Sequence, residues 1–382
     1  MTRQTETLII GGGISGMACG RSLAAAGRDF LLCSDRMGGR MYASADGLNF
    51  GAAYVTPDYQ HVLPFVDRIE SNRMRDVYYW DGRRMITVFS PRNLIRAAQL
   101  AKIYALLIPY RRHLNRLREQ VPHECQKTLM EHDDLLSKYV RMPASEFVER
   151  HGLHAMNTIF CDPLQHSTLF VTTEQTNAFY WLANLFPSLI PAYTVDVRPA
   201  VGRLTAGWEQ QILPHKATAV TPVDGGNRFE VRVGEETIAC RNLVVAVPRH
   251  NSEGLVDVPC STKTVPYCTV HIRGQRRRAY KPGKTVFLRR EHPIRCLWPQ
   301  SSGVDIAFGP TENPDLSEYY ERYEIFGSVA WKTACQITGA DWRPLRVREN
   351  LFAIGDHNIL GLEDSYLTGL YAANRILETT PE

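Results

Sequence analysis

The sequence of 382 residues predicts an α/β protein, with one domain built on parallel strands and a mixed helical and β-sheet domain inserted into it. Three observations support this fold class. A short apolar run, residues 8–10, leads directly into a glycine-rich turn, residues 11–16. A second apolar run, residues 30–33, follows a segment of helix length, and a third occupies residues 351–354. This order of strand, glycine turn, helix and strand is typical of a Rossmann-like dinucleotide-binding domain.

The opening unit, residues 8–33, has the features of one βαβ motif. Gly11, Gly13 and Gly16 have the spacing that lets a strand turn sharply, backbone N–H groups approach a pyrophosphate, and a helix pack against the sheet. Residues 17–26 are expected to form that helix, with Gly27 as its C-cap. Because a helix N-terminus carries unpaired N–H groups and partial positive charge, we expect this turn to bind phosphate.

The composition is that of a globular protein with reduced cysteines. The chain is 44% hydrophobic and 22% charged, and its formal net charge of +4 is not gathered into one basic run, which argues against nucleic acid as a partner. The nine cysteines form no CxxC pair and no metal-ligand spacing, so we predict no metal site. The sequence shows no signal-peptide pattern and no run of about eighteen apolar residues, and we expect a cytoplasmic protein.

Three further segments carry a family resemblance. Residues 38–40 (Gly-Gly-Arg) follow the second strand, residues 49–53 form a turn of small residues, and residues 351–356 precede a helix expected over residues 363–373. In this order they resemble the FAD-dependent superfamily of flavoprotein amine oxidases, phytoene desaturases and protoporphyrinogen oxidases. The resemblance implies a glutathione-reductase-type FAD domain, in which the arginine fork binds the pyrophosphate. Residues 48–52, 142–147 and 355–356 also resemble the polyunsaturated fatty acid isomerases of this superfamily.

The resemblance also implies which residues contact FAD. Val220 would offer backbone groups to the adenine, Asp356 would bond the ribityl or phosphate end, and the helix beginning near Glu363 would point its N-terminus at the flavin. At the ribose, the superfamily usually has an acidic residue where this chain has Ser34, so either Asp35 takes that role or the ribose is held more weakly. The full set of expected contacts is Gly11, Gly13, Ile14, Ser15, Gly16, Ser34, Asp35, Gly38, Gly39, Arg40, Gly51, Ala52, Ala53, Val220, Gly355, Asp356, Glu363, Asp364 and Ser365.

The segment from residue 58 to residue 199 is expected to be mainly helical. The predicted helices cover residues 59–71, 91–108, 126–139 and 142–152, with a hairpin over residues 77–85 and Pro109 ending the second helix. The arginines at 111, 112, 116 and 118 follow a broad apolar face. They have two interpretations: a membrane-surface patch that admits an apolar substrate, or a solvated helical cover with ordinary surface arginines.

The second half of the chain is expected to add strands to both domains. A strand over residues 217–220, a hairpin over residues 228–240 and a buried parallel strand over residues 242–248 belong to the first domain. Strands over residues 264–272, 284–288 and 294–298 belong to the second, and Arg276–Arg278 is expected to be an exposed loop. The predicted FAD-binding domain comprises residues 1–57, 200–255 and 345–382, and the substrate domain comprises residues 58–199 and 256–344.

The chemistry is expected to be hydride transfer. The sequence has no second GxGxxG motif that would bind NAD(P)H. Candidate catalytic residues are His271 and His166 as proton carriers, because histidine titrates near neutrality, although a lone histidine in an apolar stretch also suits a core. By resemblance to the isomerases, Arg75 or Arg73 would bind a carboxylate. Aromatic residues would line an apolar cavity or fill a helical core, namely Phe160, Phe170, Phe179, Tyr180, Trp181, Phe186 and Tyr193.

Three functions follow from these patterns. The first is an FAD-dependent desaturase, dehydrogenase or redox-neutral isomerase that acts on an apolar or unsaturated small molecule. The second is an amine or amino acid oxidase, although the strand expected to carry the family's lysine, residues 267–273, has none. The third is a binding protein that keeps the fold with weak or lost FAD. The oligomeric state has no signature in the sequence.

Overall fold

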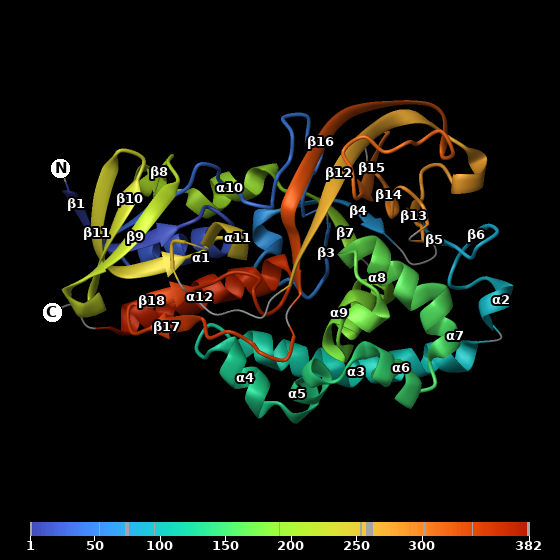
Figure 1. Cartoon of the computed structure of the whole chain (residues 1–382), viewed down its shortest axis with the longest axis horizontal. Helices are drawn as coiled ribbons and strands as arrows, with labels where there is room; N and C mark the ends of the chain where they lie inside the picture. Colours follow the sequence, from blue (N-terminus) through green and yellow to red (C-terminus); the bar gives the residue numbers. More distant parts are fainter. Residues whose placement is uncertain are drawn as a thin grey trace.

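The computed structural model describes residues 2–52, 54–72, 76–94, 96–190, 192–252, 254–256, 263–289, 291–300, 303–337 and 339–379. One half of the elongated molecule contains a sheet flanked by α1 and α12, and the other contains a second sheet and a layer of helices (Figure 1). No helix in the described ranges has both the length and the apolar character needed to cross a bilayer.

The first sheet is the predicted dinucleotide-binding sheet. Among the described residues its main path has the order β17-β18-β11-β1-β2-β8, and β10 and β9 extend from β11 as an antiparallel pair. Strand β1 pairs in parallel with both β2 and β11, which puts the apolar residues 8–10 at the centre of the sheet. The strands are β1 (Thr2–Ile10), β2 (Phe30–Cys33), β8 (Ile212–Leu213), β9 (Ala217–Val223), β10 (Arg228–Val233), β11 (Glu236–Val245), β17 (Arg346–Arg348) and β18 (Leu351–Ala353).

Helices α1 (Ile14–Ala25) and α12 (Leu362–Glu378) lie against this sheet and against each other. Their contact is close because Gly369 faces α1. A Cβ at Gly369 would lie 2.2 Å from the backbone oxygen of Ser15, so any larger residue would force the helices apart. Phe30, Trp208 and Phe352 are buried in the core beneath them. Helix α10 (Arg198–Thr205) packs against α1, and the short helix α11 (Arg249–Ser252) follows β11 in the chain.

The second half contains two smaller sheets. In the described chain, one has the order β16-β12-β15-β14-β13-β5-β6 and the other the order β3-β7-β4. Strands β12 and β16 are long and curve together from the centre of the molecule to its far end (Figure 1). The strands are β3 (Tyr54–Val55), β4 (Asp67–Asn72), β5 (Val77–Trp80), β6 (Met85–Ile86), β7 (Ala192–Asp196), β12 (Lys263–Arg276), β13 (Thr285–Phe287), β14 (Cys296–Pro299), β15 (Val304–Gly309) and β16 (Tyr320–Ile337).

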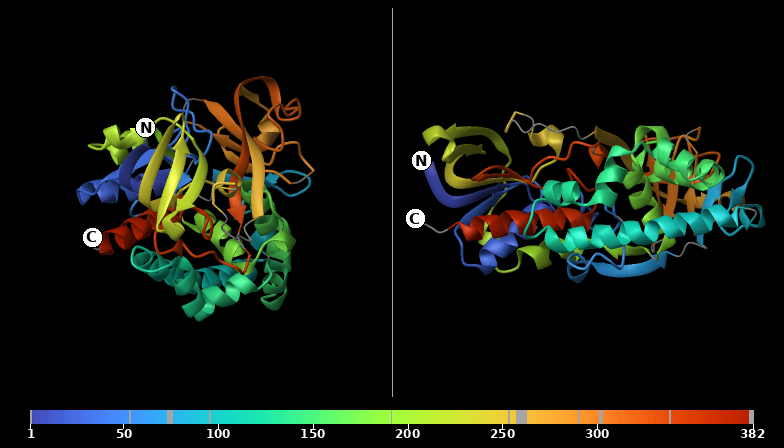
Figure 2. Two further views of the ribbon diagram at one scale, coloured as in Figure 1. Left: turned by 60° about the vertical axis from the view of Figure 1, so that its left-hand side comes forward. Right: turned by 90° about the horizontal axis from the view of Figure 1, so that it is seen from below.

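A layer of helices covers this half and continues beneath α12 (Figure 2). Their buried faces, together with residues of the seven-stranded sheet, form the largest apolar cluster of the molecule. The helices are α2 (Pro91–Leu94), α3 (Ala97–Gln120), α4 (Gln126–His132), α5 (Asp134–Arg141), α6 (Ala144–Arg150), α7 (His154–Met156), the π-helix η3 (Asn157–Cys161), α8 (Asp162–Leu169) and α9 (Ala178–Leu189). Short 3₁₀ turns lie at η1 (Leu63–Phe65), η4 (Thr173–Gln175), η5 (Glu209–Gln211), η6 (Asp224–Gly226) and η7 (Arg278–Tyr280).

Several element predictions are wrong. The helix predicted over residues 59–71 is a 3₁₀ turn followed by strand β4, which pairs with β7. Pro109 does not end its helix: α3 runs through it to Gln120. The proline has no N–H to donate to the backbone carbonyl of Ala105, but Ala105 is exposed, so water can bond that carbonyl instead. Residues 126–139 form two helices, because Asp133 caps a new one. The hairpin strand and the parallel strand predicted over residues 236–248 are one continuous strand, β11.

Two predictions about arginines are also wrong. Arg276 is not in an exposed loop: it is buried at the end of β12, where it pairs with Asp305. Arg118 is not a surface arginine, because its guanidinium bonds Asp364 and Asp58 inside the molecule. Both positions lie in sequence runs rich in arginine, and the partner carboxylates lie far away in the sequence.

The predicted fold class is confirmed: a Rossmann-like sheet carries an inserted part made of helices and strands. The aromatic residues proposed as cavity lining are mainly core residues, since Phe160, Phe179, Tyr180 and Trp181 are almost fully buried in the helical cluster. The domain boundaries given above stay a prediction.

Candidate functional site

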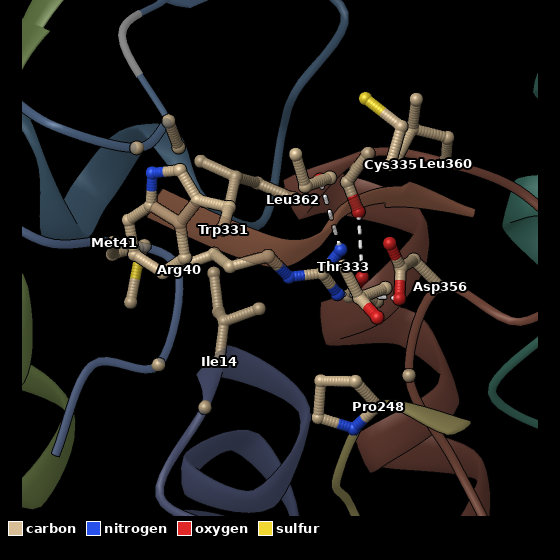
Figure 3. Close-up of a pocket in the computed structure, with 18 of the residues that line it drawn as sticks. Ile14, Arg40, Met41, Pro248, Trp331, Thr333, Cys335, Asp356, Leu360 and Leu362 are labelled. Atoms are coloured by element: carbon tan, nitrogen blue, oxygen red, sulfur yellow. Dashed lines mark hydrogen bonds and ion pairs between the residues drawn. The ribbon is translucent and has the colours of Figure 1, made fainter. Parts of the chain in front are cut away.

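A cavity of about 520 Å³ begins at the glycine-rich turn and continues into the second half of the molecule. The glycine-rich turn after β1, the start of α1, the segment after β18 and the first turn of α12 line one end, and residues from β12 to β16 and α8 line the other. This size is within the usual range for small-molecule pockets. Figure 3 shows Ile14 on one side of this space, Trp331 and Met41 on another, and Arg40 reaching across toward Asp356.

The glycine-rich turn has the geometry of a phosphate loop. Gly11 has φ +114°, and a Cβ there would lie 2.6 Å from the backbone oxygen of Ala246, so only glycine fits. Gly13 is the N-cap of α1 and has open space around its Cα. In the described chain no side chain caps this helix, and its first turn has no acidic residue. Its N–H groups and the positive end of its dipole therefore face the pocket.

The Gly38-Gly39-Arg40 segment forms the neighbouring wall. The N–H of Gly38 donates to the backbone oxygen of Gly12 at 2.8 Å, and a Cβ at Gly39 would lie 3.1 Å from the Cα of Gly13. Gly51 is held equally closely, because a Cβ there would lie 1.9 Å from the backbone oxygen of Arg40. These contacts keep side chains out of the space beside the phosphate loop.

Arg40 and Asp356 form an ion pair inside the pocket. Nη2 of Arg40 lies 2.5 Å from Oδ1 of Asp356 (Figure 3). Nε2 of Gln336 donates to the same oxygen at 2.6 Å. Burial alone would raise the pKa of Asp356, but Arg40 outweighs it and holds that pKa below the usual range. The pocket therefore contains a fixed cation beside the phosphate loop, with its orientation set by a residue 316 positions away.

The predicted ribose end is polar. Ser34 and Asp35 both line the pocket, and Oγ of Ser34 donates to the backbone oxygen of Arg36 at 2.7 Å. The guanidinium of Arg36 lies over the rings of Tyr42 and Trp331, 5.0 and 5.4 Å from their centroids. Because the Ser34 hydroxyl donates to its own turn, the Asp35 carboxylate is the acidic group available here for ribose hydroxyls.

The first turn of α12 faces the pocket with its backbone, not with its acidic side chains. Gly361, Leu362 and Ser365 line the cavity. Glu363 instead accepts from the backbone N–H groups of His61 and Val62 and lies 2.7 Å from Nδ1 of His61.

Asp364 also points away from the pocket and toward α3. It accepts two bonds from Arg118, at 2.9 Å from Nε and at 2.7 Å from Nη2. Arg118 also donates to Asp58 at 2.9 Å, and its guanidinium lies 5.6 Å from the ring centroid of Tyr59, which lines the cavity. The geometry therefore gives Glu363 and Asp364 the role of anchoring α12, rather than that of contacting a cofactor.

The far end of the cavity is an aromatic chamber. Of the described residues that line it, none is charged. Tyr54 and Trp298 stack there with ring centroids 5.6 Å apart. Burial raises the pKa of Tyr54 to about 12 and raises that of Tyr267 well above its usual value, so both phenols stay protonated at neutral pH. The chamber is lined by Tyr54, Tyr59, Thr168, Leu169, Tyr267, Phe287, Cys296, Trp298, Phe308 and Leu360.

The predicted site residues divide into three groups. Those that line the cavity are Gly11, Gly13, Ile14, Ser15, Ser34, Asp35, Gly38, Gly39, Arg40, Gly51, Ala52, Gly355, Asp356 and Ser365. Those that are described but do not line it are Gly16, Val220, Glu363, Asp364, His166 and His271. Arg75, its alternative Arg73, and Ala53 lie outside the described residues.

The residues that do not line the cavity have other structural positions. Gly16 packs against the backbone oxygen of Gly11, where a Cβ would lie 2.0 Å away. Val220 is paired within the β9–β10 hairpin. His271 is fully buried on β12, bonded through Nε2 to the backbone oxygen of Asn49 at 2.8 Å and packed on Phe50; burial lowers its pKa, so it is a neutral core residue. His166 is half-buried on α8.

Strand β16 provides pocket residues that the sequence analysis missed. Trp331, Lys332, Thr333 and Cys335 all line the cavity, and Trp331 donates from Nε1 to the backbone oxygen of Phe50 at 2.8 Å. The signal in the sequence is weak, because residues 329–337 are mostly apolar or small and do not alternate regularly with polar ones. Because β16 pairs with β12, its Lys332 lies beside the strand on which the lysine was expected.

The fold is that of a Rossmann-like α/β protein with an inserted part made of helices and strands, and the cavity lies between the two. Residues 9–69 match the model of the NAD(P)-binding Rossmann-like domain family. No curated protein matches the sequence.

Solved structures share the fold over nearly the whole chain. Putrescine oxidase bound to putrescine is similar at 13% identity and a TM-score of 0.71, over 99% of this chain and 100% of that one. The CLA-producing fatty acid isomerase from P. acnes is similar at 14% identity and a TM-score of 0.69, over 97% of this chain and 98% of that one. Cyclohexylamine oxidase from Brevibacterium oxydans IH-35A is similar at 13% identity and a TM-score of 0.66, over 97% of each chain. The chain thus shares its fold with these two oxidases and with this isomerase, as the predicted resemblance implied.

Proposed function

We propose that this protein is an FAD-dependent oxidoreductase that transfers hydride between the flavin and an apolar or unsaturated small molecule. The observation that carries the proposal is the continuous cavity, which joins a phosphate loop with an uncapped helix N-terminus to an uncharged aromatic chamber. A dinucleotide with an attached redox ring fits such a layout, because its phosphates and its ring need opposite environments.

The chain's own residues would hold and orient the cofactor. The N–H groups at the start of α1 and the guanidinium of Arg40 would bind the two phosphates, and Asp35 would bind ribose hydroxyls. The N-terminus of α12, with its acidic side chains turned away, would place positive potential at the ring. FAD, when bound, supplies the hydride acceptor or donor.

The aromatic chamber would bind the substrate and exclude water. Its lining favours an uncharged carbon-rich compound, because an ion placed among protonated phenols and apolar rings would lose its hydration without gaining a partner. Desaturation, dehydrogenation and redox-neutral isomerisation all suit such a substrate.

An absorbance spectrum of the purified protein, with and without added FAD, tests the cofactor. We expect the absorption bands of a bound flavin. Anaerobic mixing with linoleic acid then distinguishes the chemistry: bleaching of the flavin indicates net oxidation, whereas persistent colour with an altered double-bond pattern indicates isomerisation. Protein that stays colourless after FAD is added would refute the redox proposal and favour a binding protein.

Lys332 supports a second candidate, an amine oxidase. It lines the cavity from β16, next to the strand that was expected to carry the lysine of these enzymes. Peroxide release in air with putrescine or cyclohexylamine would support this function, and Lys332→Met should then lower the rate at least tenfold without loss of flavin. Absence of peroxide with a panel of amines would exclude the amine oxidase function.

A further inference from the structure

The outer face of α3 changes from apolar to cationic along its length. Tyr104 and Ile108, one helical turn apart, are 36% and 53% exposed. Arg112 and Arg116 continue the same stripe and are exposed too. We call this stripe the α3 outer face; its exposed members are Ala97, Ala98, Ala101, Tyr104, Ala105, Ile108, Arg112 and Arg116.

The α3 outer face is not needed for the core. The opposite side of the helix provides its packing residues, which are buried: Ile103, Leu107, Tyr110, Leu114 and Leu117. Seen from below, α3 runs along the outside of the molecule over most of the length of the helical layer (Figure 2). A second exposed aromatic side chain, Phe89 at 52%, precedes α2 at the same end of the molecule as the start of α3.

The charge of the helix is mostly positive. From residue 97 to residue 118 the sequence contains no aspartate or glutamate, while it contains Lys102, Arg111, Arg112, Arg116 and the internally paired Arg118; the one acidic residue of α3 is the exposed Glu119 in its last turn. Such a distribution gives a positive potential over the exposed stripe.

We propose that the α3 outer face docks on the surface of an anionic phospholipid bilayer. Tyr104 and Ile108 would enter the boundary between headgroups and acyl chains, while Arg112 and Arg116 would bind lipid phosphates. A helix with large apolar side chains on one part of a stripe and cations on the rest suits such a flat, negatively charged interface. A protein interface is less suited, because the centres of protein interfaces are depleted in charge.

Docking goes beyond the proposed redox function and does not rest on it. Its consequence would be a route to substrate, since apolar compounds dissolve in bilayers and the aromatic chamber is built for such compounds.

Vesicle sedimentation of the full-length protein tests the proposal. We expect at least tenfold more binding to vesicles of phosphatidylcholine with 30% phosphatidylglycerol than to pure phosphatidylcholine, and a large loss at 0.5 M NaCl because salt screens the arginines. Arg112→Glu with Arg116→Glu should abolish binding, and Tyr104→Ser with Ile108→Ser should lower it about tenfold. The matched control is Arg232→Glu with Tyr323→Ser, since both side chains are exposed on strands outside the helical layer.

Circular dichroism and thermal melting verify that each variant is folded. Equal binding to both vesicle types, no binding to either, or no effect of the arginine substitutions would overturn the proposal. A concentration-dependent dimer that the Tyr104 and Ile108 substitutions dissociate, together with absence of vesicle binding, would assign the face to a second copy of the chain instead. A colourless protein that still binds anionic vesicles would refute the redox function and leave the docking surface intact.

Discussion

At the scale of single residues, the ion pair between Arg40 and Asp356 fixes the position of the guanidinium that would bind a phosphate in the pocket. The carboxylate orients the guanidinium, and Gln336 fixes the carboxylate in turn. An arginine held in this way loses little side-chain freedom when it binds an anion, so more of the interaction appears as affinity.

Arg40→Met should therefore weaken FAD binding about 10- to 100-fold, because a hydrogen bond to a charged group contributes about 1.5–3 kcal/mol. Quenching of flavin fluorescence measures the dissociation constant. Arg68→Met, which removes a guanidinium stacked on Tyr193 away from the cavity, is the control and should leave affinity unchanged. Unchanged affinity in Arg40→Met would show that the phosphates lie elsewhere.

A second residue-scale prediction concerns His61. The hydrogen bond that Nδ1 of His61 donates to the Glu363 carboxylate raises the pKa of His61 above its ordinary value of 6.5, so the folded state binds this proton more tightly than the unfolded state does. The stabilisation is fully present below about pH 6.5 and is lost as the pH rises through the higher folded-state pKa.

The difference in urea midpoint between the wild type and His61→Gln should therefore be largest near pH 5.5 and shrink by pH 8.5. The same substitution at exposed His215 should show no such trend. A difference that grows with pH would contradict the assignment.

The sequence predicted the backbone part of the site better than its side chains. The glycines at 11, 38, 39 and 51 were recognisable because their positions need the absence of a Cβ. The directions in which the Glu363 and Asp364 side chains point could not be predicted. They depend on the rotation of α12 and on Arg118, which is 246 residues from Asp364. The role of His271 was equally hidden, because an alternating strand pattern does not say which face meets a cavity.

At the scale of elements, Arg118 ties three segments together: α3, the turn at Asp58 and the first turn of α12. The Asp364 side chain is fully buried and that of Arg118 is 12% exposed. This fork holds the N-terminus of α12 against the cavity, although neither Arg118 nor Asp364 lines it.

Arg118→Met should lower the free energy of unfolding by about 3–5 kcal/mol, since it leaves a buried carboxylate without its partner. Adding Asp364→Asn should restore a large part of that loss by removing the charge. The control is Arg150→Met, which breaks a pair of similar length between side chains about half exposed and should cost less than about 1 kcal/mol. Urea titration measures all three, and equal losses at Arg118 and Arg150 would contradict the argument.

Predictions of elements failed where tertiary pairing decided the structure. Residues 59–71 were predicted as one helix, but residues 67–72 become β4, because they pair with β7. Strand β16 went unnoticed because residues 321–324 near its start are exposed and mainly charged, and its pairing with β12 defines it. Local rules were sufficient for α1 and α12, which follow glycine turns and carry apolar residues that the packing buries.

At the scale of the whole molecule, the cavity is shared between the two halves. One end lies in the Rossmann-like sheet and the other in the seven-stranded sheet, so a ligand that spans the cavity contacts both. Such a ligand binds only the folded chain, and its binding energy adds to the stability of the whole.

FAD should therefore raise the melting temperature in proportion to the logarithm of its concentration. At about 100 times the dissociation constant the added stability is about 2.7 kcal/mol, which differential scanning fluorimetry detects as a shift of a few degrees. NAD⁺ at the same concentration should give a smaller shift. A larger shift with NAD⁺ than with FAD would identify the nicotinamide dinucleotide as the preferred ligand.

The close contact between Gly369 of α12 and Ser15 of α1 has a consequence for biosynthesis. Helix α1, which is synthesised before α12, needs α12 against it, and Arg40 needs Asp356, so the end of the cavity beside the glycine-rich turn is incomplete until residues 351–378 have left the ribosome. A nascent chain would hold its glycine turn and its arginine without the strand and helix that close the cavity, and a ligand of this cavity could bind only after those residues had been synthesised.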